Sequence, residues 1–241
     1  GAGGGTAPAE CFTPGGVTII SNSGNMVNTI ASYLLPYGIG THFGISTGKD
    51  VLIMTPLKEL LQLAGRSEET KVVVLYVEPG GLYEQEAITW MRESDFDTPL
   101  VVYVAGTLTE ERNVSLGHAG AVVEGPQTSA TGKMAAFDEY FETGPFAPGM
   151  FNGGGGKQAG KGIRGTALHH IPEAAMGIYS ARGLQRDFPA SGKLRLNPWF
   201  VDFGKLAAVT PSRLLLSTGT IPEPYGYHFR KHAKATLGLA P

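Results

Sequence analysis

Short apolar runs alternate with segments of helical periodicity along the amino-terminal half of the chain, and this alternation restricts the folds open to it. The runs expected to form strands are residues 17–21, 42–46, 71–77 and 100–105. Between them, apolar residues recur at helical spacing in residues 26–35, 56–64 and 83–93. Strands that are apolar throughout and that alternate with helices indicate a parallel sheet covered on both faces.

Composition and charge narrow the classes of function. A hydrophobic fraction of 42% and a charged fraction of 17% are typical of a globular protein. The net charge of −2 gives no electrostatic reason to expect nucleic acid or an anionic membrane as a partner, so any anion site must be local. No run of about 18 apolar residues occurs, and the sequence predicts no membrane span. The single cysteine, Cys11, fits a reducing compartment, so we expect the cytoplasm, or the mitochondrial matrix in a eukaryote.

Three polar stretches follow the predicted strands. Ser23-Gly24 comes after the first strand, Glu78 after the third, and a loop containing His118 after the fourth. Parallel sheets bind ligands beyond the carboxyl ends of their strands. We therefore expect the three stretches to lie together at one edge of the sheet.

Each stretch has an ordinary structural interpretation beside a functional one. The first amides of a helix starting at Ser23-Gly24 can bind an anion, although Ser23 could serve only as an N-cap. Glu78 could accept the N–H of an imidazole and fix its tautomer, or it could be a solvated carboxylate at a strand end. Gly117 and Gly120 clear space around His118, although such a pattern also arises by chance in a glycine-rich chain.

Taken together, the three stretches predict a covalent phosphohistidine. His118 would be the nucleophile and Glu78 would orient it. The helix start at Ser23-Gly24 would hold the phosphoryl oxygens.

Two other patterns do not lead to sites. Residues 155–162 nearly match a nucleotide-binding P-loop, but a glycine stands where a serine or threonine must bind magnesium, so a flexible loop is expected. The pair His169-His170 and the pair His228 and His232 have no cluster of carboxylates or thiols to support them. No metal site is therefore predicted.

The order of these motifs resembles the α subunit of succinyl-CoA synthetase and the wider family of nucleoside-diphosphate-forming acyl-CoA ligases, which includes ATP-citrate lyase. The matching stretches are PGGVTIISNSG at 14–24, VEPGG at 77–81 and GHAGA at 117–121, with Lys133 in the helix that follows. Three motifs in the family's order are far more specific than any one of them.

The resemblance implies site residues and partners. It implies that His118 is phosphorylated during turnover, in a loop with Gly117 and Gly120, and that Glu78 contacts it. Ser23, Gly24 and Asn25 would begin the helix whose N-terminus binds the phosphohistidine. The implied cofactors are ATP or GTP with Mg²⁺, bound mainly by the nucleotide-grasping domain of a β-type partner subunit, and coenzyme A, held by a CoA-binding domain or subunit. The substrate would be a small carboxylic acid.

The expected organisation has three parts. Residues 1–13 are a linker or processed amino terminus, and 14–183 form the phosphohistidine domain, an α/β fold with a flavodoxin-like parallel sheet and helices on both faces. A glycine-rich insertion occupies about 145–161, before a last strand and helix within 162–176. Residues 184–241 are an irregular, proline-rich C-terminal extension suited to wrapping a partner.

The function expected from these features is that of a subunit or fragment of an acid–CoA ligase that is active only with partner chains. One alternative is a scaffold or regulatory subunit without turnover, which would need none of the histidine, glutamate and serine. The other is part of an enzyme like ATP-citrate lyase, which would need a citrate-synthase-like domain. The sequence does not name the acid or the nucleotide.

Overall fold

A computed structural model gives the structure of the chain and describes residues 11–50, 52–107, 110, 122–143, 146–149 and 160–192. The chain divides into two units, residues 1–194 and 195–241, and all described residues belong to the first. Its elements, in chain order, are β1 (Pro14–Ser21), α2 (Gly24–Leu34), η1 (Leu35–Tyr37), β2 (Thr41–Ser46), α3 (Leu57–Gly65), β3 (Val72–Val77), α4 (Tyr83–Glu93), β4 (Leu100–Val104), η2 (Pro126–Thr128), α6 (Ala130–Phe141), β5 (Gly162–Gly165) and α7 (His170–Ala181).

The described strands form one five-stranded sheet in the order β2-β1-β3-β4-β5, and every neighbouring pair is parallel. This order and direction confirm the predicted α/β fold with a flavodoxin-like sheet. The chain runs outward from β1 to β2 on one side and from β3 to β5 on the other. The connections after β1 and β3 therefore diverge, and in folds of this type ligands bind beyond the carboxyl ends of two such strands.

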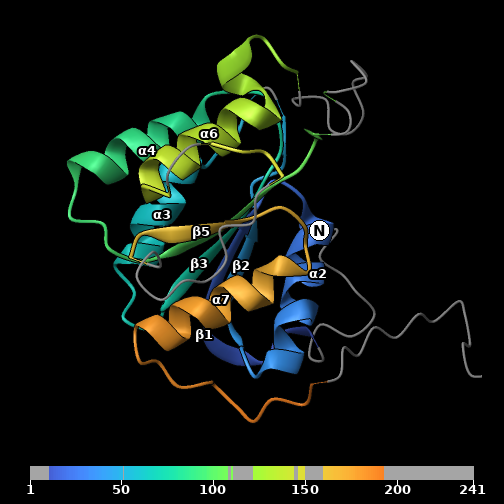
Figure 1. Cartoon of the computed structure of the whole chain (residues 1–241), viewed down its shortest axis with the longest axis vertical. Helices are drawn as coiled ribbons and strands as arrows, with labels where there is room; N and C mark the ends of the chain where they lie inside the picture. Colours follow the sequence, from blue (N-terminus) through green and yellow to red (C-terminus); the bar gives the residue numbers. More distant parts are fainter. Residues whose placement is uncertain are drawn as a thin grey trace, which may run out of the picture. The chain divides into compact units, whose positions relative to one another are not determined.

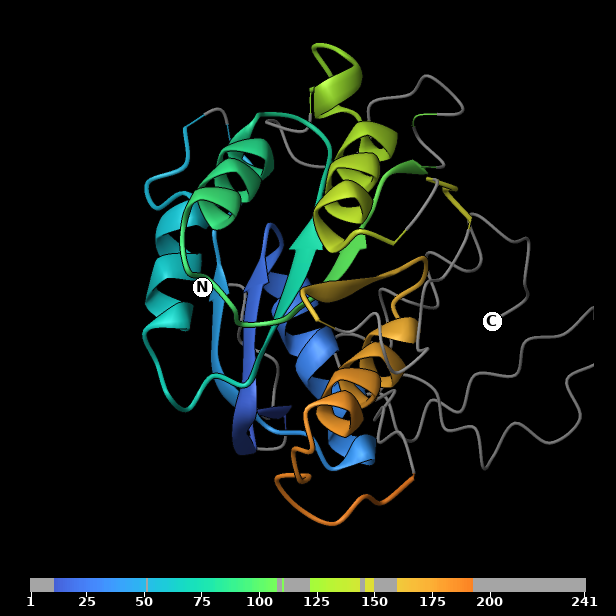
Figure 2. The ribbon, with the colours of Figure 1, turned by 60° about the vertical axis from the view of Figure 1, so that its left-hand side comes forward.

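Each face of the sheet is covered by its own group of helices. Figures 1 and 2 show α2 and α7 side by side on one face, with α3, α4 and α6 on the other. Val73 and Leu75 of β3 belong to the core under α3, α4 and α6, whereas Val72 and Val74 belong to the core under α2 and α7. Burial of such side chains contributes about 1.5–3 kcal/mol each. Helices cover both faces of the sheet, so a ligand can reach the sheet only at the ends of its strands.

The boundaries of the elements follow the sequence closely. The helix predicted at 83–93 is α4, and the strand predicted at 71–77 is β3. Helix α2 ends at Leu34, just before Pro36, which lacks an amide N–H and cannot continue the helix. Gly38 follows with a φ of 76°, in the left-handed region that favours glycine. The strand and helix expected within 162–176 are β5 and α7.

The segment after α7 lies against the amino ends of β1 and β2. The Asp187 carboxylate accepts hydrogen bonds from the amides of Gly16 at 3.2 Å and Gly40 at 2.8 Å, and from the hydroxyl of Tyr179 at 3.3 Å. The amides of Asp187 and Phe188 both donate to the carbonyl of residue 38. The first nine residues of the predicted extension, 184–192, therefore pack on the domain itself. The rest of the extension lies outside the described residues.

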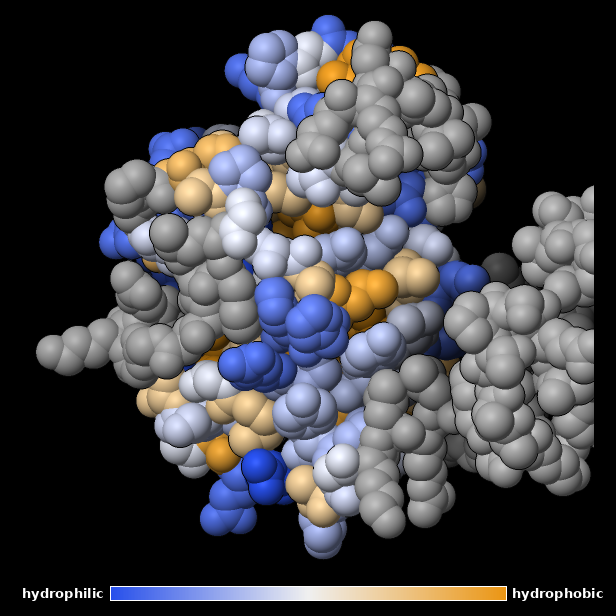
Figure 3. Space-filling model, turned by 45° about the vertical axis from the view of Figure 1, so that its right-hand side comes forward, coloured by the Kyte–Doolittle hydropathy of each residue, from blue (hydrophilic) through white to orange (hydrophobic). Residues whose placement is uncertain are grey.

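One face of the described domain mixes hydrophobic and hydrophilic residues. Figure 3 shows this face, on which hydrophobic patches lie between hydrophilic residues. Within the described ranges, no helix combines the length and the apolarity that a membrane crossing requires.

Candidate functional site

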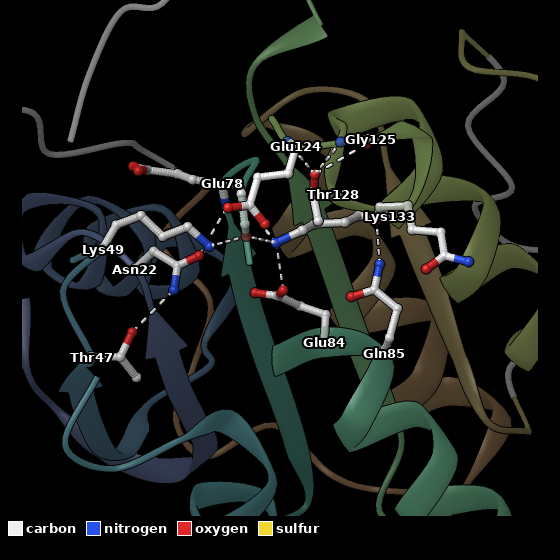
Figure 4. A network of polar contacts seen from close by, with 12 residues as sticks. Asn22, Thr47, Lys49, Glu78, Glu84, Gln85, Glu124, Gly125, Thr128 and Lys133 are labelled. Carbon is white, nitrogen blue, oxygen red and sulfur yellow. Dashed lines mark hydrogen bonds and ion pairs between the residues drawn. The ribbon is translucent and has the colours of Figure 1, made fainter. Parts of the chain in front are cut away.

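Asn22 joins the carboxyl ends of three strands. It follows β1 directly and is 8% exposed. Its side-chain amide donates to the hydroxyl of Thr47, after β2, at 3.0 Å, and its Oδ1 accepts the amide N–H of Glu78, after β3, at 2.8 Å (Figure 4). The sequence indicated only a polar turn here and did not single out Asn22. Its place in the stretch PGGVTIISNSG, between a buried strand and a glycine turn, was the available signal.

The N-terminus of α2 presents amide groups at the same edge. Ser23 is the N-cap, with extended backbone, but its side chain makes no capping hydrogen bond. No acidic residue lies in the first turn of this helix of 11 residues. Among the described residues, no acceptor takes the amides of Gly24 and Asn25. These amides are therefore available to an anion, as at any helix start, and the role of Ser23 stays a prediction.

Glu78 is held through its backbone on both sides. Its amide donates to Asn22, and its carbonyl accepts a hydrogen bond from the ammonium of Lys133 at 3.0 Å. Two residues on, the amide of Gly80 donates to the carbonyl of Thr128 at 2.7 Å. Gly80 has a φ of 90°, where a side chain would be strained. The loop that carries the half-buried Glu78 is thus fixed by neighbouring elements rather than by its own turn.

Two buried lysines lie beneath this loop. Lys133 of α6 is fully buried and forms an ion pair with Glu84 of α4 at 2.5 Å. Lys49, in the connection after β2, donates to the carbonyl of Gly80 at 2.6 Å. Burial, the largest effect, lowers the pKa of Lys49 to about 8. Lys133 was noted in the sequence only as part of the family resemblance, and Lys49 was missed because nothing in its local sequence distinguishes it from a surface lysine.

The predicted histidine loop is described only at its two ends. Gly117, His118 and Gly120 lie outside the described residues. Before them, the Glu110 carboxylate accepts hydrogen bonds from the amide of Thr131 at 3.1 Å and its hydroxyl at 2.9 Å, at the start of α6.

After the histidine, the hydroxyl of Thr128 accepts from the amide of Glu124 at 2.9 Å, and the Thr128 carbonyl binds Gly80. Both ends of the undescribed segment are therefore anchored at the amino end of α6. That end of α6 is linked to the Glu78 loop through Gly80.

The other patterns noted in the sequence give no site in the described structure. Of residues 155–162, the last begins β5, so the glycine run leads into a strand, whereas a P-loop leads into a helix. Burial, with His169 beside it, lowers the pKa of His170, whose Nδ1 lies 3.2 Å from the Thr166 hydroxyl. Within the described ranges, no three His, Cys, Asp or Glu residues gather as metal ligands. His228 and His232 lie outside those ranges.

Apolar side chains are exposed in two of the loops at the carboxyl edge. Leu52 and Met54 lie in the connection from β2 to α3 and are 80% and 94% exposed. Leu82, between the Glu78 loop and α4, is 45% exposed. Exposed large apolar residues in neighbouring loops are typical of surfaces that bind another protein.

Comparison with known proteins identifies relatives for this arrangement. Residues 14–141, more than half of the chain, match the family described as the succinyl-CoA ligase-like flavodoxin domain. The α-2 subunit of an ADP-forming succinate–CoA ligase from Archaeoglobus fulgidus is 40% identical over 134 residues, covering 56% of this chain and 46% of the relative. The α subunit of a malate–CoA ligase from Methylorubrum extorquens is 33% identical over 147 residues, covering 61% of this chain and 49% of the relative.

A solved structure shows the same fold. ATP citrate lyase from Methanosaeta concilii superposes with a TM-score of 0.60 and 22% identity, over 88% of this chain and 30% of that protein. At this identity the likeness extends to the fold alone. The chain spans about half the length of the curated relatives it matches.

Proposed function

The chain belongs to the family of succinyl-CoA ligase-like flavodoxin domains, and from this membership we propose that it is the phosphoryl-carrying part of a nucleoside-diphosphate-forming acid–CoA ligase. In the proposed reaction a phosphoryl group moves from a nucleoside triphosphate to His118, releasing the diphosphate. It then moves to the carboxylate of a small acid, which becomes an acyl phosphate and leaves His118 free. Attack of the coenzyme A thiol on the acyl carbon releases phosphate and forms the thioester.

The observation that carries this proposal is the connection of Asn22 to Glu78. One side chain ties the start of α2, which offers anion-binding amides, to the loop that offers a carboxylate. Both ends of the segment that contains His118 are anchored beside the same loop. Phosphoryl transfer through a histidine needs a carboxylate that orients the imidazole and donors for the phosphoryl oxygens, and the proposal is that His118 lies between these two parts.

Each residue has a distinct proposed role. Glu78 accepts the N–H of one imidazole nitrogen and leaves the other with its lone pair toward the phosphorus. The amides of Gly24 and Asn25, with the hydroxyl of Ser23, donate to the phosphoryl oxygens at the positive end of α2. Gly117 and Gly120 let the backbone approach the transferred group.

The nucleotide and coenzyme A are proposed to reach this site with a partner. The relatives are named as α subunits, so the partner would be a β-type subunit that binds ATP or GTP with Mg²⁺. A CoA-binding domain or subunit would hold coenzyme A. The exposed Leu52, Met54 and Leu82 support a protein contact at this edge, which would also keep water from the phosphoryl group.

Labelling with γ-phosphate-labelled ATP tests the proposal. The protein is isolated from its source with the chains that copurify, and GTP is tested in parallel. We expect an acid-labile, base-stable label on the chain that is lost in His118→Ala. His42→Ala is the control and should keep the label, because His42 lies near the amino end of β2, away from the proposed site. The chain purified by itself should form no thioester from short carboxylic acids, coenzyme A and ATP.

Each arm can contradict one part of the proposal. A label that persists in His118→Ala would show that another residue is the acceptor. Thioester formation by the isolated chain would remove the need for a partner. A complex that forms thioester but never carries the label would leave the family membership intact and would rule out the phosphohistidine.

A further inference from the structure

Two buried ammonium groups meet at one carbonyl oxygen beneath the Glu78 loop. Lys49 and Lys133 both donate to the carbonyl of Gly80, at 2.6 and 2.5 Å. They come from different parts of the chain, the connection after β2 and helix α6, and are 2% and 0% exposed. Figure 4 shows the two lysines reaching this point from opposite sides.

The charges in this cluster are unequal. Glu84, itself 2% exposed, forms an ion pair with Lys133. Among the described residues, no carboxylate lies within ion-pair distance of Lys49, which Glu84 and Glu78 attract only from farther away and which donates to the carbonyl of Gly80. A buried charge without a partner costs several kcal/mol, and an apolar side chain of similar size would avoid that cost. Packing alone therefore does not account for a lysine at position 49.

The hydrogen bond of Lys49 acts on the part of the loop that sets the position of Glu78. Gly80 lies two residues after Glu78, and its backbone adopts the left-handed conformation. Lys133 binds the carbonyls of both residues, so it holds the loop from the α6 side. Lys49 holds the same carbonyl from the β2 side. Loss of either bond would let the loop move with respect to the start of α2.

We propose that Lys49 is a positioning residue for the Glu78 loop, and that its ammonium group supplies the positive charge that balances a phosphoryl anion arriving at this edge of the sheet. The inference rests on the proposed function. Lys49 would be a further residue of the proposed site, one that does not touch the phosphoryl group and acts through the Gly80 carbonyl. The charge on Lys49 is costly while the site is empty and is offset when an anion binds.

The proposal predicts a pH dependence with a definite sign. The pKa of Lys49 is lowered to about 8, chiefly by burial and also by the neighbouring Lys133, while Glu84 and Glu78 oppose the shift. The ammonium form is therefore present below about pH 8 and is lost as pH rises through that value. Phosphorylation of the protein should slow over the same range, because the uncharged amine neither balances the anion nor binds the carbonyl as strongly.

The test compares three variants in the complex isolated with its partner chains. Lys49→Met keeps the length and removes the charge, Lys49→Arg keeps a charge that does not titrate, and Lys58→Met removes an exposed lysine of α3 as the matched control. With labelled ATP, Lys49→Met should be phosphorylated ~10–100-fold more slowly at pH 7, with little change in the KM for ATP. Lys49→Arg should recover part of the rate and show no decline near pH 8. Lys58→Met should match the wild type.

A second measurement does not depend on turnover. In protein labelled with ¹³C at the lysine ε-carbon, the resonance absent from Lys49→Arg should titrate near pH 8 in the wild type. Titration of this resonance above pH 10 would overturn the proposal. If Lys49→Met fails to fold, this titration alone tests the role of Lys49. Wild-type protein that labels normally, with Lys49→Met equal to it at every pH, would also overturn the inference and leave the proposed function standing. Wild-type protein that takes no label would instead refute the proposed function, and this inference with it.

Discussion

Asn22 shows how much of the proposed site depends on one side chain. Its amide and carbonyl groups connect Thr47 and Glu78, which lie 25 and 56 residues farther along the chain. Because both groups of this buried side chain are used, an aliphatic replacement would leave the amide of Glu78 without its acceptor. The spacing between the anion-binding end of α2 and the carboxylate of Glu78 is thus set by two hydrogen bonds of one residue.

Glu78→Gln should slow phosphorylation of His118 while leaving the fold intact. The amide keeps the shape of the side chain, but it loses the charge that favours a proton on the imidazole nitrogen facing residue 78. Orienting and acid–base groups typically contribute ~10²–10⁴-fold in rate. Single-turnover labelling at pH 7 measures the effect, and Glu86→Gln, on the exposed face of α4, is the control. Equal rates for Glu78→Gln and the wild type would return Glu78 to the role of a solvated carboxylate.

The sequence alone places some residues at the carboxyl edge of the sheet and misses others. Ser23, Gly24 and Glu78 were predictable, because the ends of parallel strands meet at one edge whatever the details of packing. Asn22 and Lys49 were not, because their roles depend on the distance to backbone groups of distant loops. No periodicity or local motif reports such a distance. The position of His118 stays a prediction, since it lies outside the described residues.

At the scale of elements, a buried ion pair joins β5 to α6. Arg164 donates two hydrogen bonds to Asp138, at 2.8 and 2.7 Å, and both side chains are at most 2% exposed. Arg164 also binds the carbonyls of Ala147 and Pro148, at 3.1 and 3.2 Å. The start of the predicted glycine-rich insertion is therefore attached to the edge strand.

Arg164→Met should lower the free energy of unfolding by about 3–5 kcal/mol, because it leaves Asp138 buried without its partner. Replacing both residues, Arg164→Met with Asp138→Leu, should recover much of this loss. Lys161→Met is the matched control, since its pair with Glu142 is exposed and solvent screening leaves such a pair with little effect on stability. Urea unfolding followed by circular dichroism gives the values. A single variant as stable as the double variant would contradict the account.

The elements differ in how far the sequence predicts them. The runs that form β1, β3 and β4 are dense in β-branched and aliphatic residues, and the helices between them have clear apolar faces, so their existence and approximate ends could be predicted. β5 is four residues long, contains two glycines and buries an arginine. It was expected only from the family resemblance, because the partner that makes its arginine acceptable lies on α6.

At the scale of the whole described domain, the two cores depend on different lengths of chain. The core under α3, α4 and α6 is made by residues up to Phe141, whereas the core under α2 includes Ile163 of β5 and Ile171 and Ile178 of α7. The match to the family ends at residue 141. The matched region therefore leaves one face of the sheet without half of its covering helices.

A fragment of residues 11–141 should therefore be markedly less stable than a fragment of residues 11–192. In the shorter fragment Val74 of β3 and Val101 of β4, now fully buried in the core shared with α7, would face water where α7 is missing. We expect it to bind a hydrophobic dye and to unfold without a sharp transition, while the longer fragment unfolds cooperatively. Thermal melts and dye fluorescence measure both. A cooperative melt of the shorter fragment at the same temperature would show that α7 contributes little.

The contacts of Asp187 with the amides of Gly16 and Gly40 have a consequence for how the protein is made. The hydrogen bond to Gly16 spans 171 residues. During synthesis at about 5–20 residues per second, the amino ends of β1 and β2 wait roughly 10–30 s for the carboxylate that binds them. Throughout that interval the newborn chain exposes these strand ends, so the time during which chaperones and proteases can reach them is set by the time needed to translate as far as Asp187.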